Sequence, residues 1–361
     1  MESTQQATID TVLASAHRQA GARVGVWFGC ALPDDFGDWR AEYGFARESV
    51  ALIDKNYRSY ISFTGPDRVR YLNAILTNDI KGLQENRGTI SMLLNPQGRI
   101  LAELETFALP EKLFCVSYAI IRERLIAWMD KYIIMDDVTL TDESERYATL
   151  ALEGPKAAEI VRELTGIALS GMIELQSADV TVSSIPCRVV KRSPSGAAGA
   201  EFVTEKTNVA RLWMALRDEA KKARGGAMGY TALNALRLEQ GIPWFGYDFG
   251  EKQIPHEAGL EHSHISYTKG CYTGQEIVER VRSRGQTNRV RVLLKFDAEV
   301  SAGMDLRADD KEIGYVTRAG FSPALNAMMG MGYVRREKSE IGTVLQYANG
   351  MATIIEPPLA S

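Results

Sequence analysis

Two strand-to-helix junctions of the same type constrain the fold of this 361-residue chain. Residues 57–63 alternate aromatic or β-branched residues with polar ones, a strand pattern that ends at Gly65 and the proline after it. Residues 146–153 form a second strand pattern, which ends at Gly154 and another proline. Proline is favoured in the first turn of a helix, so a helix is expected after each junction. Two such units about ninety residues apart predict two similar lobes.

The residues after the first junction predict a mixed lobe. Strands are expected at 89–94 and 99–107, joined by the turn Asn95-Pro-Gln-Gly98, because a proline and a glycine stand at usable turn positions. A further strand is expected at 113–118 and a helix at 122–132. The resulting β-α-β-β-β-α-β order, with 146–153 as its last strand, favours an α+β sandwich of ferredoxin-like character.

The C-terminal part of the chain has a different pattern. Short strand segments at 289–296, 312–318 and 331–334 are separated by turns, which is typical of a small β-barrel or sandwich. A chain of this length also exceeds one ordinary core, so several domains are expected. We therefore predict a barrel domain at 286–361 after a larger region, 1–285. That region contains two α+β lobes, approximately 50–140 and 1–49 plus 141–285.

Composition narrows the class of protein. Hydrophobic residues make up 45% of the chain, yet charged residues or glycine interrupt every apolar run before it reaches the length of a membrane span. The first residues are polar and do not have the pattern of a secretory signal. The four cysteines are widely spaced and no Cys-x-x-Cys pair occurs, so free thiols, no metal site and a cytoplasmic location are expected. Nothing indicates an obligate assembly, so a monomer or a weak dimer is expected.

A net charge of -4 argues against general binding to nucleic acid. A local basic run does exist, and Arg280, Arg282 and Arg284 alternate along it, so on a strand they would share one face. An anionic ligand is favoured there over transfer RNA, because no aromatic residues are interleaved with the arginines. A solvated face balanced by nearby glutamates is the simpler alternative.

Three loops rich in glycine, proline and aromatic residues follow the helix that ends near Glu239. They read Gly241-Ile-Pro-Trp-Phe-Gly-Tyr-Asp248, then Ile254-Pro-His-Glu-Ala-Gly-Leu260, then Lys269-Gly-Cys-Tyr-Thr-Gly-Gln-Glu276. Loops of this composition often carry binding residues, and planar aromatic side chains beside Asp248 are suited to a flat heterocycle. The same aromatics are equally consistent with a loop that caps a core.

These loops resemble the central signature of the glycine-cleavage T-protein (GcvT) family, and the segment 269–276 resembles the defining motif of its YgfZ branch. The resemblance implies an α+β cloverleaf of three domains around a central folate site, with a small C-terminal β-barrel. It implies tetrahydrofolate, or a one-carbon-substituted or polyglutamylated folate, as cofactor. YgfZ-like proteins bind folate and assist the maturation or repair of iron–sulfur proteins, so iron–sulfur clients become expected partners. The alternatives are a folate-dependent aminomethyltransferase or demethylase, and a non-catalytic scaffold.

The sequence departs from the aminomethyltransferase pattern at two places. The family's Asp-Asp pair on the strand after the hairpin corresponds here to Ala102 and Glu103. Neighbours on a strand face opposite ways, so only one of the two faces keeps a carboxylate. A second family carboxylate, which contacts the pterin, corresponds to Ala197, and Glu201 remains as the distal acid. Both losses weigh against aminomethyl transfer, and Glu103, Glu201 or Glu239 would have to recognise the pterin.

Cys271 is the strongest candidate for a catalytic residue. Lys269 stands two residues earlier, so on an extended segment its charge shares a face with the thiol and would favour the thiolate. The simpler alternative is a small buried hydrophobe, which is how most free cysteines behave. Arg237 and Glu239 are expected to form an internal polar pair or to contact the ligand. The predicted catalytic residues are thus Cys271 and Glu103, and the predicted folate-binding residues are Lys269, Arg237, Glu239, Tyr247, Asp248, Tyr118 and Glu201.

Overall fold

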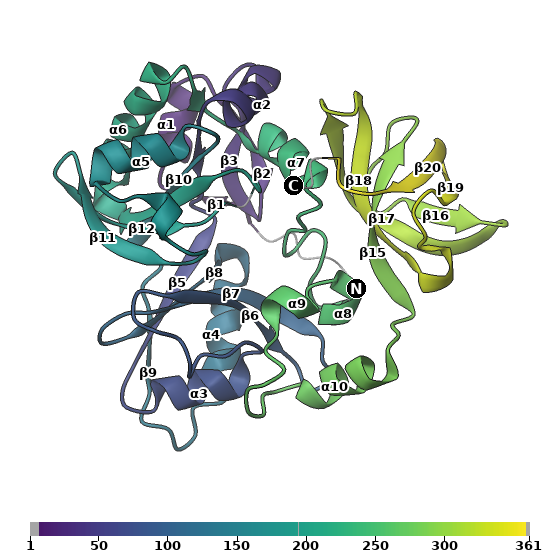
Figure 1. Ribbon diagram of the computed structural model, residues 1–361, viewed down its shortest axis with the longest axis horizontal. Helices are drawn as coiled ribbons and strands as arrows, with labels where there is room; N and C mark the ends of the chain where they lie inside the picture. The colour runs from purple at the N-terminus through teal and green to yellow at the C-terminus, as the bar shows by residue number, and fades with distance from the viewer. Residues whose placement is uncertain (1–6, 194, 359–361) are drawn as a thin grey trace. The chain divides into compact units, whose positions relative to one another are not determined.

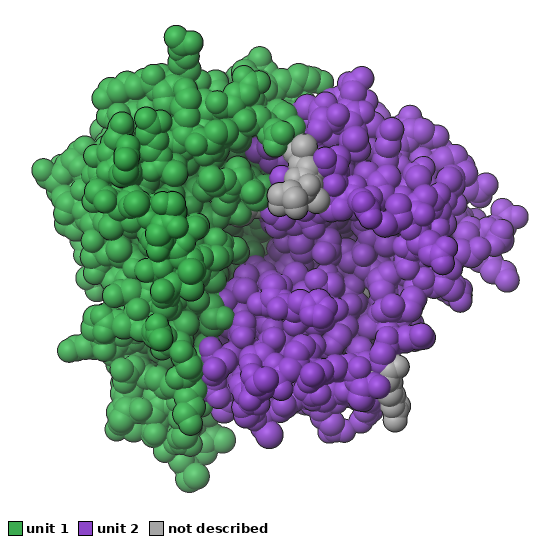
Figure 2. Space-filling model, viewed as in Figure 1, with its two compact units in different colours: residues 1–71, 80–89, 104–233 green, residues 72–79, 90–103, 234–361 purple. Residues whose placement is uncertain are grey.

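A computed structural model describes residues 7–193 and 195–358. Residues 1–6 of the expected region 1–285, residues 359–361 of the expected barrel domain, and Pro194 lie outside the described residues. The chain divides into two compact units, which are coloured separately in Figure 2. Unit 1 consists of residues 1–71, 80–89 and 104–233, and unit 2 consists of residues 72–79, 90–103 and 234–361.

Unit 1 contains a six-stranded sheet in the order β11-β12-β13-β10-β4-β14. Helices α5 and α6 pack on this sheet, and Figure 1 shows them close together above it. A small sheet in the order β1-β3-β2 belongs to the same unit. The strands are β1 (Ile9–Asp10), β2 (Arg23–Trp27), β3 (Cys30–Asp35), β4 (Ala51–Asp54), β10 (Tyr147–Glu153), β11 (Ser177–Val182), β12 (Ile185–Lys191), β13 (Gly199–Glu205) and β14 (Gly226–Ala227). The helices are α1 (Ala14–Gln19), α2 (Trp39–Glu48), α5 (Ala157–Thr165) and α6 (Val209–Lys222).

The core of unit 1 lies between the six-stranded sheet and these helices. Leu150 and Leu152 of β10 and Phe202 of β13 are completely buried in it. Leu212 and Leu216, four residues apart on α6, come from the helix side and are also 0% exposed. Burying side chains of this size contributes roughly 1.5–3 kcal/mol each, so this layer fixes the positions of the strands that carry the polar residues described below.

A second sheet has the order β6-β7-β8-β5-β9. Its elements follow the chain as β5 (Arg58–Thr64), α3 (Arg68–Ile75), β6 (Gly88–Leu94), β7 (Ile100–Ala108), β8 (Leu113–Tyr118), α4 (Arg122–Asp130) and β9 (Thr139–Asp142). The expected element order is therefore present, but β9 closes it, whereas the sequence assigned that place to 146–153. That segment is β10 of the six-stranded sheet. The strand β9 was missed because it is short, mostly exposed and polar, with no apolar alternation to mark it.

Both glycine-proline junctions occur where the sequence expected them. Gly65 has φ +95°, and a Cβ there would stand 2.2 Å from the carbonyl oxygen of Asp137. Gly154 has φ +129°, and a Cβ there would stand 2.6 Å from the carbonyl oxygen of Ser49. Only glycine is compatible with both the backbone angle and the close approach, and α3 and α5 begin shortly after the two junctions.

Unit 2 is built on a closed six-stranded barrel, β15-β18-β17-β16-β19-β20, which confirms the predicted C-terminal barrel. Its interior holds Leu294, Leu306 and Val334, which are 0% exposed. The strands are β15 (Arg289–Phe296), β16 (Asp305–Ala308), β17 (Lys311–Ser322), β18 (Ala327–Arg335), β19 (Val344–Tyr347) and β20 (Gly350–Ile355). Before the barrel come α7 (Tyr230–Glu239), α8 (Pro255–Ala258), α9 (Glu261–His264) and α10 (Gln275–Arg284). The protein is thus of the predicted α+β class.

Candidate functional site

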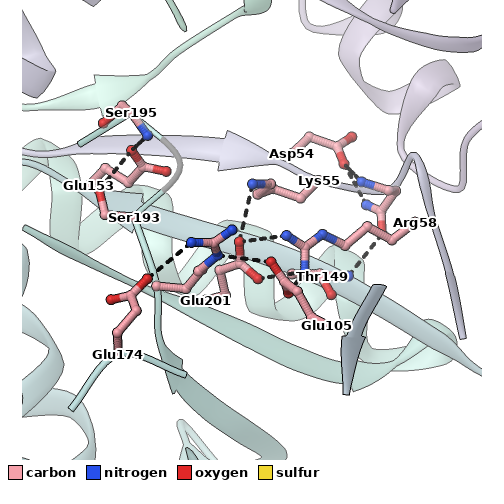
Figure 3. Close-up of polar contacts among 12 residues, drawn as sticks. Asp54, Lys55, Arg58, Glu105, Thr149, Glu153, Glu174, Ser193, Ser195 and Glu201 are labelled. Carbon is pink, nitrogen blue, oxygen red and sulfur yellow. Dashed lines mark hydrogen bonds and ion pairs between the residues drawn. The ribbon is translucent and has the colours of Figure 1, made fainter. Parts of the chain in front are cut away.

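Glu201, one of the predicted binding residues, lies in a buried ionic cluster of unit 1 (Figure 3). Its side chain projects from β13 and is 1% exposed. One carboxylate oxygen accepts a hydrogen bond from Arg58 Nη2 at 2.9 Å, and the other lies 2.8 Å from Arg58 Nη1. Lys55 Nζ lies 3.1 Å from the same carboxylate. The charge of Glu201 is therefore balanced by two cations of its own unit.

A second carboxylate, Glu105 of β7, completes the centre of the cluster. It accepts hydrogen bonds from Arg58 Nη1 at 3.0 Å and from Arg192 Nε at 2.8 Å. Arg192 also donates a hydrogen bond to Glu174, whose side chain is 53% exposed. Burial alone would raise the pKa of Glu105, but Arg58, Arg192 and Lys55 outweigh it and hold that pKa at about 2. Glu105 is consequently ionised at neutral pH although it is almost completely buried.

Two polar atoms of the cluster have no hydrogen-bond partner among the described residues. They are Lys55 Nζ, whose contact with Glu201 is an ion pair without hydrogen-bond geometry, and Glu153 Oε1. The other oxygen of Glu153 accepts from the backbone N–H of Ser195 at 3.1 Å and from the hydroxyl of Ser193 at 3.4 Å. Burial raises the pKa of Glu153 and Lys55 opposes this rise. Such atoms usually bond a water molecule or a ligand group, so the cluster has one donor and one acceptor available for a polar ligand.

Tyr118, another predicted binding residue, lies at the end of β8 in a group of stacked aromatic rings. Its ring centroid is 5.5 Å from that of Tyr57 at 26°, and 5.5 Å from that of Phe28. The guanidinium carbon of Arg58 lies 6.0 Å from the centroid of Tyr57. Tyr57 thus connects Tyr118 to the ionic cluster that contains Glu201, and unit 1 brings these two predicted residues into one neighbourhood.

Glu103, the predicted carboxylate of β7, belongs to unit 2 and has a different partner. Its Oε1 lies 3.0 Å from Nε2 of His264 at the end of α9. The other ring nitrogen, Nδ1, lies 2.7 Å from the hydroxyl of Ser263. Ala102, the preceding residue, is completely buried. At positions 102 and 103 the strand therefore has a single carboxylate, that of Glu103, and this carboxylate contacts the imidazole of His264.

Lys269 fastens its loop to the end of α3 within unit 2. Its ammonium donates hydrogen bonds to three backbone carbonyl oxygens, those of Asn73, Leu76 and, at 3.1 Å, Asn78. Burial lowers the pKa of Lys269 to about 8, and Asp79 opposes this change. The last carbonyl groups of a helix lack partners inside the helix and attract cations. Lys269 acts here as a clamp, and its ammonium is directed to these carbonyls instead of to the thiol of Cys271.

Cys271 is exposed, whereas Cys30, Cys115 and Cys187 are buried free cysteines on strands. Burial raises the pKa of each of the three buried thiols to about 12, so they are unreactive at neutral pH. The exposure of Cys271 excludes the simpler alternative of a small buried hydrophobe at that position.

The predicted internal pair of Arg237 and Glu239 is wrong. Arg237 is completely buried and pairs with Asp248, which also accepts from the backbone N–H of Trp244 at 2.9 Å. Glu239 instead accepts from the hydroxyl of Ser322 at 2.6 Å. Residues two apart on a helix do not face each other, so each side chain finds its own partner. Asp248 therefore serves Arg237 and the loop backbone.

Tyr247 is half-buried and packs against an arginine of the barrel. The guanidinium carbon of Arg318 on β17 is 4.6 Å from the centroid of the Tyr247 ring, a cation–π distance. The guanidinium carbon of Arg237 stands in the same way 4.6 Å from the centroid of the Trp244 ring. Two aromatic side chains of the loop 241–248 thus pack against arginines, of which Arg237 is completely buried and Arg318 is half-buried.

Comparison with known proteins shows which family the chain belongs to. The model of the GCVT N-terminal domain matches residues 13–265, and the model of the glycine cleavage T-protein C-terminal barrel domain matches residues 289–359. The chain belongs to the glycine-cleavage T-protein (GCVT) family. It is 26% identical over 339 residues to an aminomethyltransferase of Thermoanaerobacter pseudethanolicus, covering 93% of this chain and 92% of that one. It is 27% identical over 342 residues to an aminomethyltransferase of Streptomyces avermitilis, covering 92% and 91%.

One solved structure has the same fold. The crystal structure of glycine cleavage system aminomethyltransferase T from Bartonella henselae superposes with a TM-score of 0.88 and covers 98% of each chain. Its sequence is 23% identical to this one. The GCVT fold is therefore retained over essentially the whole length although most side chains differ.

The basic run of this GCVT-family chain is not a strand. Helix α10 spans Gln275–Arg284, so the expected row of three arginines on one strand face does not form. Arg280 pairs with Glu276 at 2.7 Å and Arg282 with Glu279 at 3.5 Å, at helical spacings of four and three residues. The alternating arginines wrongly suggested a strand. They also fit a helix, because glutamates three or four residues away from them form pairs that stabilise a helix. The balanced face that the sequence offered as the simpler alternative is the better description.

The part of the chain that the structure describes contains neither a metal-binding group of side chains nor a membrane-spanning helix. No group of three or more His, Cys, Asp or Glu side chains is arranged to hold a metal ion. No helix within residues 7–193 and 195–358 is long and apolar enough to cross a membrane.

Little in the sequence indicates the ionic cluster of this GCVT-family chain. Lys55, Arg58 and Glu105 are single charged residues within or beside apolar strand patterns, and Arg192 follows a strand. The only available signal was the presence of charge at strand positions that alternation assigns to the interior. Pairing between residues up to 143 positions apart, as for Arg58 and Glu201, is not visible in local patterns.

Proposed function

We propose that this chain is a tetrahydrofolate-binding, YgfZ-like member of the GCVT family that assists the maturation or repair of iron–sulfur proteins. Membership of the family supports a folate-related role, because its relatives are named aminomethyltransferases. The observation that carries the more specific proposal is Cys271, an exposed thiol in a loop that Lys269 clamps to α3.

A single thiol on a fixed loop is suited to a transient reaction with iron or sulfur. Thiolate sulfur is the usual ligand of iron–sulfur clusters, and a cluster needs several such ligands. Cys271 supplies one, so the remaining ligands would come from a client protein or from a second copy of the chain. The clamp limits the motion of the loop and keeps the thiol on the surface for such an encounter.

The polar groups of the structure are compatible with a folate ligand. Folate carries and releases one-carbon units when bound to proteins of this kind. In unit 2, Glu103 is the carboxylate that remains after the loss at Ala102, and its side chain is 14% exposed. In unit 1, the ring of Tyr118 is suited to stacking on a flat heterocycle. Lys55 Nζ, which is ion-paired with Glu201, and Glu153 Oε1 have no hydrogen-bond partner among the described residues, and they are suited to a carbonyl or aminopyrimidine edge.

Glu201 is less suited to this role than the sequence suggested. Two cations already neutralise its carboxylate, and a third partner would have to displace Arg58 or Lys55. A buried carboxylate that is fully paired contributes little further attraction for a ligand. We therefore assign folate recognition to Glu103 in preference to Glu201.

Aminomethyl transfer or demethylation is the second candidate function, favoured by the names of the relatives. In this case Glu103 would stabilise positive charge on the folate nitrogens as the one-carbon unit moves. Formation of methylene-tetrahydrofolate from an aminomethylated carrier protein, lost in Glu103→Gln, would establish this activity and displace the first proposal.

Calorimetric titration of the full chain with tetrahydrofolate and its polyglutamates tests the folate assignment. We expect saturable binding that weakens at least about tenfold in Glu103→Gln, because a charge-assisted hydrogen bond is lost. Glu111→Gln, which changes an exposed glutamate in the segment between β7 and β8, is the matched control and should bind normally. Absence of binding to the wild-type chain would refute the folate role and favour a non-catalytic scaffold.

A complementation experiment tests the thiol. In a strain that lacks this protein, the wild-type chain should restore the activity of iron–sulfur enzymes, and Cys271→Ala should not. Cys187→Ala is the control because its thiol is buried. Full restoration by Cys271→Ala at equal protein level would contradict the assigned role of this residue.

A further inference from the structure

Ser263, His264 and Glu103 form a continuous chain of polar contacts in unit 2. The hydroxyl of Ser263 is 2.7 Å from Nδ1 of His264, and Nε2 of the same ring is 3.0 Å from Oε1 of Glu103. Ser263 is exposed, while the side chains of His264 and Glu103 are 7% and 14% exposed. The chain thus leads from the surface to a carboxylate that is largely removed from water.

The backbone holds the imidazole in place independently of Glu103. The carbonyl oxygen of His264 accepts a hydrogen bond from the hydroxyl of Thr77 at 2.6 Å, and that hydroxyl accepts from the backbone N–H of Met92 on β6 at 2.8 Å. The carbonyl oxygen of Ser263 accepts a hydrogen bond from the side-chain Nδ2 of Asn78 at 3.3 Å. The turn that carries Ser263 and His264 is therefore tied to its neighbours at two successive residues, and the ring does not depend on a single contact for its orientation.

We propose that Ser263 and His264 form a proton relay between solvent and the carboxylate of Glu103. The hydroxyl of Ser263 has two acceptors within reach, Nδ1 of His264 at 2.7 Å and the carbonyl oxygen of Leu260 at 3.4 Å. In the resting state of the relay it donates to the nearer acceptor, Nδ1, and Nε2–H donates to Glu103. When Glu103 takes up a proton, the proton comes from Nε2, Nδ1 takes the proton of the Ser263 hydroxyl, and water restores that hydroxyl. One proton moves from solvent to Glu103, and the ring changes from the Nε2–H to the Nδ1–H tautomer.

Such a relay supplies what a solitary carboxylate lacks. Ala102 contributes no proton-carrying group beside Glu103, and the carboxylate itself is mostly buried. Acid–base work at a buried group requires that its proton be replaced in each cycle, and histidine transfers protons readily near neutral pH. Ser263 and His264 act through Glu103 and are positioning residues. The value of the relay to catalysis or folate binding rests on the proposed function, in which Glu103 is the group that meets folate.

Proton exchange at His264 tests the relay without any folate. The full chain labelled with 15N-histidine is compared as wild type, Ser263→Thr and Ser263→Val. Threonine and valine have nearly the same shape, so both disturb packing alike, and only threonine keeps the hydroxyl. We expect the Nε2–H tautomer in the wild type and in Ser263→Thr. In Ser263→Val, exchange of the Nε2 proton with water should be slower by at least about tenfold.

A further variant shows whether Glu103 is the end of the relay. In Glu103→Gln the carboxylate is replaced by an amide of similar size that does not accept the proton. Adding Ser263→Thr or Ser263→Val to this variant should therefore give the same rate of exchange of the His264 Nε2 proton with water. Equal rates for threonine and valine in the otherwise wild-type chain would overturn the proposal.

Titration of the same labelled samples with tetrahydrofolate separates the two proposals. If folate does not bind but threonine and valine still differ, the relay stands and the folate assignment fails. If folate binds and the two variants exchange alike, the folate assignment stands and the relay is refuted.

Discussion

Glu201 and Glu103 are two carboxylates that the sequence offered for the same task, and the two units treat them differently. In unit 1, Glu201 is 1% exposed and faces Arg58 and Lys55. In unit 2, Glu103 is 14% exposed and faces the imidazole of His264. A carboxylate that is paired with arginine and lysine stays ionised and serves the structure. A carboxylate that contacts an imidazole can exchange a proton with its partner, because histidine gains and loses protons near neutral pH. The partner, more than the carboxylate itself, decides which of the two is suited to chemistry.

The largest effect is expected from removal of the central cation of unit 1. Arg58→Met leaves Glu105 and Glu201 buried without their main partner, which should lower the free energy of unfolding by about 3–5 kcal/mol. Chemical denaturation measures this change. Arg146→Met is the matched control, because Arg146 pairs with Glu143 and Glu205 while its side chain is 58% exposed, and its loss should cost no more than about 1 kcal/mol. Equal effects of the two changes would mean that the cluster is not a structural centre.

The pH dependence of stability should be carried partly by Glu105. Its pKa in the folded chain is about 2, below the ordinary value of 4.5, so its contribution is complete above about pH 4.5 and is lost as the pH falls toward 2. A difference of this size corresponds to about 3 kcal/mol. Urea unfolding of the wild type and of Glu105→Gln over this pH range isolates the contribution, because the variant should show the shallower loss. Parallel curves would contradict the assigned charge state.

A smaller effect is expected from the clamp in unit 2. Lys269→Met removes hydrogen bonds from an ammonium to three carbonyl groups but also relieves the burial of a charge, so a loss of about 1–3 kcal/mol is expected. Hydrogen exchange should show faster opening of residues 269–274 and little change in the barrel. Lys295→Met, an exposed change on β15, is the control. Unchanged protection of the loop would show that the clamp is dispensable.

The smallest effect on stability is expected at Cys271. Cys271→Ser changes an exposed side chain and should alter the free energy of unfolding by less than about 0.5 kcal/mol. Titration with a thiol reagent should nevertheless detect one fast thiol in the folded wild type and four after denaturation, because the other three are buried. The serine variant should have no fast thiol. Rapid reaction of a second cysteine in the folded chain would contradict the burial that separates Cys271 from the rest.

Local patterns were sufficient for most of the framework. Strand alternation located β5, β8 and β15, and the two glycine-proline junctions located the starts of α3 and α5. Two assignments failed where a local pattern had two solutions. The alternating arginines of α10 also fit a helix, and β9 has too little apolar character to be distinguished from a loop.

The candidate site could be predicted only in part. The motif at 269–276 identified Lys269 and Cys271, and the structure keeps the thiol exposed. It also changes the role of Lys269, because three carbonyl groups at the end of α3 hold its ammonium. His264 could not be recognised from the sequence as a partner of Glu103, because nothing near it indicates a contact with a residue 161 positions earlier.

The sequence by itself determined the α+β class, the C-terminal barrel and the presence of alanine at positions 102 and 197. These features depend on periodicity, turn residues and residue identity, which act over a few positions. Only the tertiary structure decided that Glu201 is paired with Arg58 and Lys55, while Glu103 contacts His264. The reason is physical, because the charge and burial of a side chain depend on residues that are distant in the chain and become neighbours only when the sheets pack.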